Sequence, residues 1–328
     1  MTSISRRRML SGAVGLGALA GGAARLVSPS LAATPLATVQ APSYYRHTLG
    51  TFQVTIVSDG ARPMPLPAAF VRNVSNEQVL AAAEAAYMPK GKIIAPFNPI
   101  VVNTGTKLVL IDTGYGPGLR PTVGLLPATL AAAGFDPKSI DIVLISHMHG
   151  DHILGLKNPD GSLAFPNAEI KVPEHDWAYW MSDENMARAP EGFQKSSFGF
   201  AKKIFSDIGE RVTRFRWGQE VVPGITSVES PGHTPGHSSF LIQSGGASLF
   251  YQGDVTNVPE LFLRNPDWQV MFDAEPDRAV ATRRRIYDML STDRLLVSGY
   301  HFPFPGLGHI EKVGTGYRLV PAAWNPAL

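Results

Sequence analysis

Residues 146–152, with the sequence S-H-M-H-G-D-H, decide the fold and the chemistry of this chain more than any other stretch. They directly follow residues 141–145, an apolar and β-branched run that predicts a buried strand. His147 and His149 are two residues apart, so both can project from the end of that strand. Imidazole ligands in a chain without thiolates suit zinc or a similar divalent metal.

Asp151 and His152 complete this run, and three more candidate ligands occur beside later predicted strands. His233 lies in a Gly/Pro-rich turn, Asp254 follows the run Leu-Phe-Tyr, and His301 follows a second apolar run. Open α/β sheets build their sites from several strand ends at one edge. Five histidines and two aspartates are too many for one tetrahedral ion, so we predict two ions held side by side.

The alternative is that these histidines are ordinary polar side chains, since an isolated H-x-H pair occurs by chance. The chain has only nine histidines, however, and five of them fall in the same strand-end context, which favours a metal site.

The absence of cysteine excludes a disulfide framework, zinc fingers and cysteine-ligated metal sites. A formal net charge of +2 is too small to indicate nucleic-acid binding.

With these motifs in place, the chain resembles the metallo-β-lactamase superfamily. H-M-H-G-D-H is similar to its H-x-H-x-D-H signature, and the resemblance extends from about Tyr44 to Asn325. The stretches A-P-S-Y-Y-R, L-V-L-I-D-T-G, H-T-P-G-H and F-P-G-L-G-H-I resemble the methyl parathion hydrolase branch, which contains organophosphate, lactone and aryl-ester hydrolases. The resemblance implies an α/β fold, specifically an αββα sandwich with a dinuclear metal site at one edge.

The resemblance also implies a role for each ligand. His147, His149 and His233 would hold one ion, and Asp151, His152 and His301 would hold the other, with Asp254 bridging both. Asp151 and Asp254 are the residues expected to serve catalysis directly. Zinc is the expected metal, with manganese, cobalt and iron left open because His/Asp sites accept all of them.

The periodicity of the chain agrees with a layered α/β protein but does not choose between one sheet and two. It predicts strands at Phe52–Val57, Ile100–Asn103, Lys107–Asp112, Ile142–Ser146, Ala168–Val172, Ser239–Gln243, Ser248–Tyr251 and Leu295–Ser298. It predicts helices at Glu77–Tyr87, Thr122–Ala133, Glu174–Met181, Phe198–Ile208 and Asp277–Leu290.

The N-terminus predicts an export signal, so we assign residues 1–32 to a twin-arginine signal peptide and 33–328 to the hydrolase domain. Ser5–Leu10 has the S-R-R-x-apolar-apolar form, and the apolar run Leu10–Ala24 is too short for a comfortable bilayer span. Ser30-Leu31-Ala32 offers small residues for signal peptidase. A basic tail before an Ala-rich helix is the alternative. We expect a periplasmic or secreted protein without membrane insertion after cleavage, and keep a homodimer open.

Two divalent ions can share a bridging hydroxide, because a metal lowers the pKa of bound water from 15.7 to about 7. No G-x-S-x-G or P-loop motif offers a competing nucleophile. Nothing obvious protonates a poor leaving group, which favours lactones, aryl esters and activated phosphotriesters. Asp112 and His237 are candidates for supporting the ligands, or for purely local turn contacts.

Substrate selection is expected to depend on aromatic side chains near the site. By position in the resemblance, Trp180 and Phe272 are the candidates for the pocket wall, and a long loop containing Pro63, Pro65 and Pro67 could cover the site. An apolar pocket and no evident cationic clamp favour small neutral lactones and aryl esters, with promiscuous phosphotriester hydrolysis. Organophosphate hydrolysis as the main activity, β-lactamase activity and a non-catalytic metal-binding protein are the alternatives.

Overall fold

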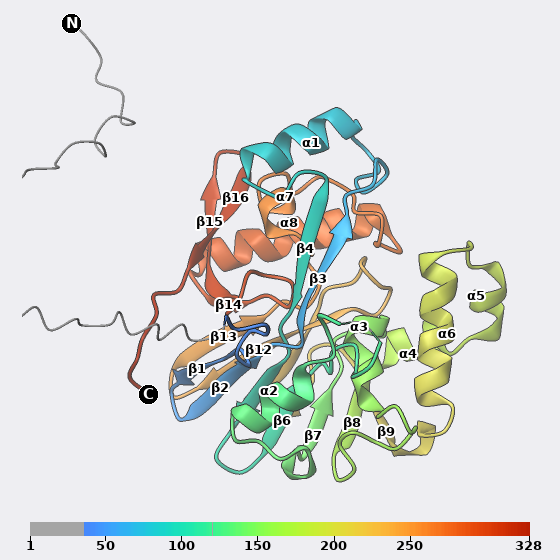
Figure 1. Cartoon of the computed structure of the whole chain (residues 1–328), viewed down its shortest axis with the longest axis vertical. Helices are drawn as coiled ribbons and strands as arrows, with labels where there is room; N and C mark the ends of the chain where they lie inside the picture. The colour runs from blue at the N-terminus through green and yellow to red at the C-terminus, as the bar shows by residue number, and fades with distance from the viewer. Residues whose placement is uncertain (1–35, 120) are drawn as a thin grey trace, which may run out of the picture. The chain divides into compact units, whose positions relative to one another are not determined.

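The run before the histidine motif forms β7 (Ile142–Leu144), an inner strand of a seven-stranded mixed sheet in the computed structural model (Figure 1). The model describes residues 36–119 and 121–328, so the predicted export signal lies outside the described residues. Residues 41–328 form the unit considered below. In spatial order, the strands of this first sheet are β1 (Tyr44–Leu49), β2 (Phe52–Val57), β5 (Ile100–Asn103), β6 (Leu108–Ile111), β7, β8 (Glu169–Pro173) and β9 (Val212–Phe215).

A second sheet also has seven strands, and its spatial order follows the sequence. Its strands are β10 (Glu220–Val222), β11 (Ile225–Glu229), β12 (Ser238–Ser244), β13 (Ala247–Tyr251), β14 (Leu296–Ser298), β15 (Leu307–Val313) and β16 (Gly316–Pro321). Parallel pairing occurs in both sheets, along β6-β7-β8-β9 in the first and between β13 and β14 in the second. Parallel pairing places the carboxyl ends of neighbouring strands at one edge, where ligands bind in open α/β sheets.

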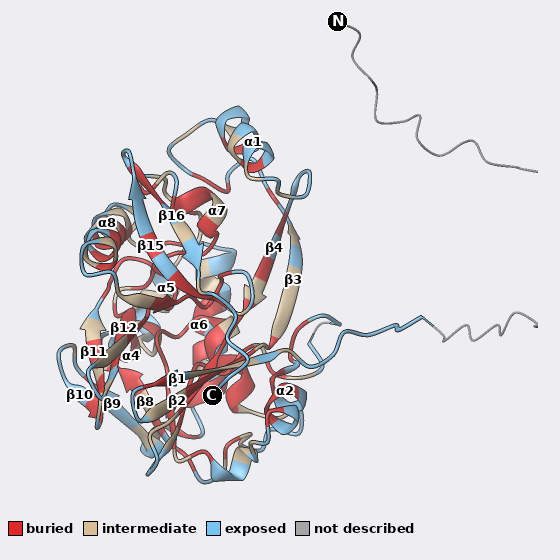
Figure 2. Cartoon of the chain, turned by 90° about the vertical axis from the view of Figure 1, so that its left-hand side faces the viewer, coloured by how far each residue is buried: buried red, intermediate tan, exposed pale blue. Residues whose placement is uncertain are grey.

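Alternation of side chains along the strands creates the layers. In β6, Val109 and Ile111 pack into a cluster that also contains Phe240 and Tyr251 of the second sheet, so this cluster lies between the sheets. Leu110, between them in sequence, points to the opposite face and packs with helix residues. The inner strands β6 and β7 are almost entirely buried, whereas β3 and β15 carry many intermediate or exposed residues (Figure 2).

Helices cover the outer face of each sheet. The first sheet is covered by α2 (Leu126–Ala132), α4 (Glu174–Trp180) and α6 (Phe193–Phe205), and the second by α8 (Pro276–Thr292). The remaining helices are α1 (Asn76–Ala85), α3 (Gly150–Ile153), α5 (Asp183–Arg188) and α7 (Pro259–Phe262). This arrangement of helix, sheet, sheet and helix is the αββα sandwich that the resemblance implied.

A separate two-stranded ribbon, β3 (Gly60–Pro65) and β4 (Lys92–Phe97), belongs to neither sheet (Figure 1). The long loop predicted for Pro63, Pro65 and Pro67 is only partly present, because Pro63 and Pro65 lie on β3 and only Pro67 lies beyond the end of the strand. Proline removes one backbone donor, which an edge strand tolerates, and each ribbon strand has a partner on one side only.

Most predicted elements are present, with shifted ends. The helix predicted from Thr122 starts at Leu126, because the carboxylate of Asp59 accepts the Leu126 N–H and holds residues 122–125 as a loop. The helix predicted at residues 198–208 covers 193–205. Within residues 36–119 and 121–328, no helix combines the length and the apolar character needed to cross a membrane.

Candidate metal centre

The seven predicted ligands meet at the carboxyl edge of both sheets. The first sheet supplies the stretch from His147 to His152, which begins shortly after β7 and continues into α3. The second sheet supplies His233 from the turn between β11 and β12, Asp254 after β13 and His301 after β14. Residues far apart in sequence thus form two clusters of metal-ligating side chains.

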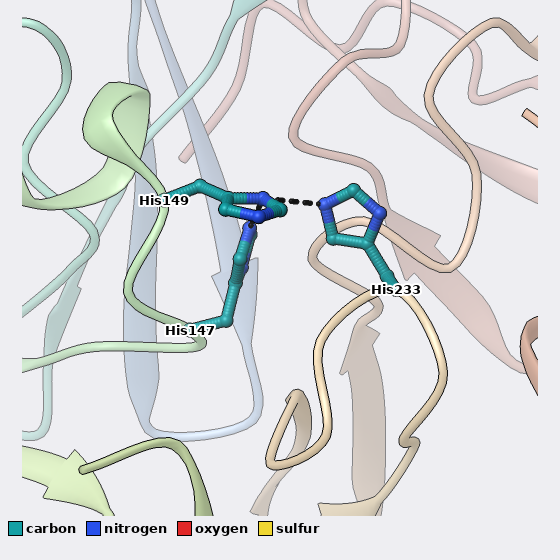
Figure 3. A group of neighbouring side chains, drawn as sticks. All are labelled: His147, His149 and His233. Carbon is teal, nitrogen blue, oxygen red and sulfur yellow. Dashed lines mark hydrogen bonds between the residues drawn. The ribbon is translucent and has the colours of Figure 1, made fainter. Parts of the chain in front are cut away.

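The first cluster is His147, His149 and His233, whose imidazoles point toward one another (Figure 3). His149 Nδ1 lies 3.1 Å from His147 Nε2 and 2.9 Å from His233 Nε2. Burial, and then the neighbouring imidazoles, lower the pKa of His147 and His149 well below its usual value. Both rings are therefore neutral at physiological pH, which is the form that binds a metal.

The second cluster is Asp151, His152, Asp254 and His301. His152 Nε2 lies 3.6 Å from Asp151 Oδ2 and 3.3 Å from Asp254 Oδ1. His301 Nε2 lies 3.4 Å from Asp151 Oδ2 and 3.0 Å from Asp254 Oδ2. Two carboxylates and two imidazoles converging in this way are an oxygen and nitrogen donor set suited to zinc and related divalent ions.

Asp254 connects the two clusters. Its Oδ2 lies 3.3 Å from His233 Nε2 and 3.0 Å from His301 Nε2, so one carboxylate contacts a ligand of each cluster. The side chain is 3% exposed, and Asn257 Nδ2 donates to Asp254 Oδ2 at 2.8 Å. A carboxylate that bridges two ions must lie between the clusters, as Asp254 does. Which ion each side chain binds stays a prediction.

Unsatisfied polar atoms test whether a metal fits this site. Among the described residues, His152 Nε2 and Asp254 Oδ1 are buried without a hydrogen-bond partner. A buried polar atom left unpaired costs about 1–3 kcal/mol, so native structures seldom keep two together. Both atoms face the second cluster, and a divalent cation there would satisfy both at once. The second cluster therefore fits a divalent ion.

Asp112 supports His152, as one of the two sequence interpretations proposed. Asp112 Oδ2 lies 2.8 Å from His152 Nδ1, and the carboxylate also accepts from the Ser146 N–H at 2.8 Å and the Tyr251 hydroxyl at 2.8 Å. Burial alone would lower the pKa of His152, but the carboxylates of Asp112, Asp254 and Asp151 outweigh it and raise the pKa. Metal binding at Nε2 would have to displace that proton.

His237 holds Asp254 from the other side. Its Nε2 accepts the Asp254 N–H at 2.9 Å, and its Nδ1 lies 3.0 Å from the carbonyl oxygen of Ser230. Burial lowers the pKa of His237 to about 3, so the ring is neutral, with the proton on Nδ1 and the lone pair of Nε2 facing the Asp254 backbone. His237 fixes the backbone of a ligand and belongs to neither cluster.

Two further contacts support the predicted ligands and were not predicted from the sequence. Asp273 Oδ1 lies 2.9 Å from His233 Nδ1, and its other oxygen pairs with buried Arg283 at 3.3 Å. His301 Nδ1 donates to the carbonyl oxygen of Pro96 at 2.8 Å. No sequence spacing marks these partners, because each depends on how a distant loop folds. The one feature of the sequence that places Asp273 near the site is its position directly after the predicted pocket residue Phe272.

A cavity of about 390 Å³ opens onto both clusters, and its wall is mostly apolar. Phe272 lines this cavity, and its ring lies 4.9 Å from the Phe193 ring. The other candidate, Trp180, does not line it, which corrects the sequence expectation. Trp180 is 0% exposed and packs behind His149 and against Phe198, because its position on α4 turns it toward the helix-side core.

The cavity wall contains one group that the sequence analysis did not anticipate. Arg62, on β3, lines the cavity together with Tyr115, and the two contact each other at 3.5 Å. Pro65 and Pro67 also line it, so the proline-rich segment does reach the site although it is not a loop throughout. The cavity is therefore apolar over most of its surface, with a cation in one wall.

The chain belongs to the metallo-beta-lactamase superfamily, whose family model matches residues 98–299. Among curated relatives, an N-acyl homoserine lactonase from a Bacillus species is 29% identical over 155 residues, which cover 42% of this chain and 54% of that protein. The N-acyl homoserine lactonase AttM of Azorhizobium caulinodans is 31% identical over 135 residues, or 39% of this chain and 45% of AttM. The matched region thus spans about half the length of these relatives.

Solved structures match over a longer stretch. The hydrolase AbOPH of the beta lactamase superfamily has a TM-score of 0.81 and 26% identity, covering 88% of this chain and all of that chain. AidC, a dizinc quorum-quenching lactonase in complex with a homoserine product, has a TM-score of 0.79 and 24% identity. The match covers 87% of this chain and 99% of the AidC chain. The second likeness establishes the common fold.

Proposed function

We propose that this protein is a dinuclear-metal hydrolase that opens lactones and cleaves aryl esters. The observation that carries this proposal is the contact of Asp254 with both ligand clusters at the end of a largely apolar cavity. Structural metal sites are closed by protein ligands, whereas catalytic sites keep positions open to water and substrate. Here both clusters adjoin a cavity of substrate size.

Two bound divalent ions would supply activated water at neutral pH, in the form of a shared hydroxide, and polarise a carbonyl oxygen. The chain's own residues hold this chemistry in place. Asp151 is 17% exposed at its side chain and lines the cavity, so it can contact the reacting group. Asn257 orients the Asp254 carboxylate, and His237 fixes its backbone. Zinc is the metal we propose, supported by the dizinc lactonase of the same fold.

Lactones are favoured because their leaving alkoxide stays tethered and because several relatives are N-acyl homoserine lactonases. The apolar wall suits an acyl chain beside the ring. Phosphotriester hydrolysis is proposed as a side activity, limited by Phe272, which occupies cavity space close to Phe193.

Metal analysis and a substrate panel on the purified protein test the proposal. We expect close to two metal equivalents, and turnover of dihydrocoumarin and N-hexanoyl homoserine lactone well above turnover of nitrocefin. Less than one equivalent in a folded, reconstituted protein would contradict the dinuclear site. Faster turnover of nitrocefin or methyl parathion than of every lactone would replace the proposed activity with β-lactamase or organophosphate hydrolase activity.

We further propose export by the twin-arginine route, based on Ser5–Leu10 and the apolar run that follows. Replacing Arg6 and Arg7 together by Lys should leave the protein in the cytoplasm with its full-length N-terminus. Cell fractionation with N-terminal sequencing measures this, and unchanged export of the double variant would contradict the route.

A further inference from the structure

The β3–β4 ribbon separates two cavities. Residues that alternate along it face opposite sides: Met64, Ile93 and Phe97 line the cavity beside the metal ligands, whereas Ile94 and Pro96 line a second cavity of about 320 Å³. The two-residue period of a strand fixes this division. The ribbon is thus a wall whose first face looks into the proposed substrate cavity.

Arg62 belongs to that first face, opposite Ala95 in the ribbon register. It is the one lysine or arginine among the described residues that line this cavity. Its contact with the Tyr115 hydroxyl is long, at 3.5 Å, and no acidic group in residues 36–119 or 121–328 forms an ion pair with it. A guanidinium has five N–H donors, so most of its donors remain for a ligand.

Arg62 lines the same cavity as the predicted ligands but belongs to neither ligand cluster. The His301 ring lies 5.2 Å from the Phe97 ring, which lies 4.9 Å from the Tyr115 ring, and Arg62 contacts the far end of Tyr115. The contacts that lead from Arg62 to the predicted ligand His301 thus pass through two aromatic side chains. A substrate whose scissile carbonyl is at the metal centre would meet Arg62 with its remote end.

We propose that Arg62 selects substrates whose remote end carries a carboxylate or another anionic oxygen group. This inference rests on the proposed hydrolase function and names the class of substrate that the cavity accepts. Guanidinium and carboxylate pair through two parallel N–H···O bonds, and the apolar surroundings strengthen that pairing.

Monophenyl adipate and phenyl hexanoate test the proposal, because they share the leaving group and chain length and differ in a terminal carboxylate. In the zinc-loaded full-length protein, Arg62→Gln should lower the ratio of kcat/KM for adipate to that for hexanoate by about five- to thirtyfold. Arg62→Lys keeps the positive charge but loses the paired N–H donors, so it should lower the ratio less than Arg62→Gln does. Arg318→Gln, which removes the same charge from an exposed ion pair on β16, is the control and should leave the ratio unchanged.

Calorimetric titration with adipate and hexanoate adds a measurement that needs no turnover. Adipate should bind wild type more tightly than hexanoate, and Arg62→Gln should remove the difference. Equal binding of both acids to wild type, or a ratio of kcat/KM that Arg62→Gln leaves within about twofold, would overturn the inference while the hydrolase function stands. If metal-loaded wild type turns over neither esters nor lactones, the proposed function fails, and the titration still decides the role of Arg62.

Discussion

The predicted metal ligands and the cavity wall are built in different ways. These residues follow strands of two seven-stranded sheets, are buried apart from the partly exposed Asp151, and are held by buried partners such as Asp112, His237 and Asp273. The wall is formed largely by a two-stranded ribbon outside both sheets and by loops around Phe272. This difference suggests that the chemistry is fixed by the framework, whereas selectivity can change in segments whose alteration leaves the sheets intact.

Replacement of Asp254 should have the largest effect, because it removes a residue of the predicted metal site and leaves the cavity wall unchanged. Asp254→Ala removes the one carboxylate that contacts both clusters, so we expect turnover of every substrate to fall by about three orders of magnitude or more, with metal content reduced. Steady-state kinetics and metal analysis measure both effects, and circular dichroism should show a retained fold. Substantial activity in a folded variant would show that the bridging role is wrong.

Asp59 anchors the loop that carries the cavity-lining residue Tyr115, so its ionisation tests the stability of that part of the wall. This buried carboxylate accepts N–H bonds from Tyr115, Gly124 and Leu126, and burial raises its pKa from 3.8 to about 6. A raised folded-state pKa means that the stabilising contribution is complete below pH 3.8 and is lost as pH rises toward 6, by up to about 3 kcal/mol.

Urea unfolding of wild type and Asp59→Asn between pH 4 and 7 measures this contribution. The wild-type free energy of unfolding should fall with pH relative to that of the variant, since other titrating groups are common to both. Parallel pH profiles would mean that Asp59 ionises with an ordinary pKa.

Phe272 tests whether the wall controls selectivity. If its ring narrows the cavity beside the ligands, Phe272→Leu should raise phosphotriester relative to lactone kcat/KM by about 10–200-fold, the range for a change in pocket shape. Phe135→Leu, in the helix-side core, is the matched control and should not move the ratio. An unchanged ratio in Phe272→Leu would assign this ring to packing.

The supporting carboxylates give the smallest and most selective effect. Asp273→Asn should weaken the ion bound through His233, and Asp112→Asn the ion bound through His152, each by about 10–100-fold in affinity. Competition with a chromophoric chelator resolves the two binding steps. Equal weakening of both steps by either variant would show that the clusters do not bind metal independently.

The sequence pointed to the residues that form the two clusters because their signal is local. His147 and His149 follow a strongly apolar strand, and Asp254 and His301 follow others, so strand ends alone bring them to one edge. The direction of Trp180 could not be predicted, because a helix of aromatic residues offers several faces and only its packing against α6 selects one.

The wall was harder to predict than the metal site. Three prolines in the segment from Pro63 to Pro67 suggest a loop, whereas pairing with β4 makes part of it a strand. The side of the ribbon that Arg62 faces depends on that register, and a shift of one residue would reverse it. The contact of Asp273 with His233 joins two loops 40 residues apart and has no sequence signature.

Each ligand cluster takes members from both sheets, and this has a consequence for how the protein matures. His147 and His149 come from the first sheet and their partner His233 from the second, and the other cluster is divided in the same way. Neither half of the polypeptide can therefore form a complete site while it leaves the ribosome. The first cluster cannot be complete before His233, nor the second before His301, has been synthesised and the two sheets have docked, so acquisition of the pair of ions is a late step in folding.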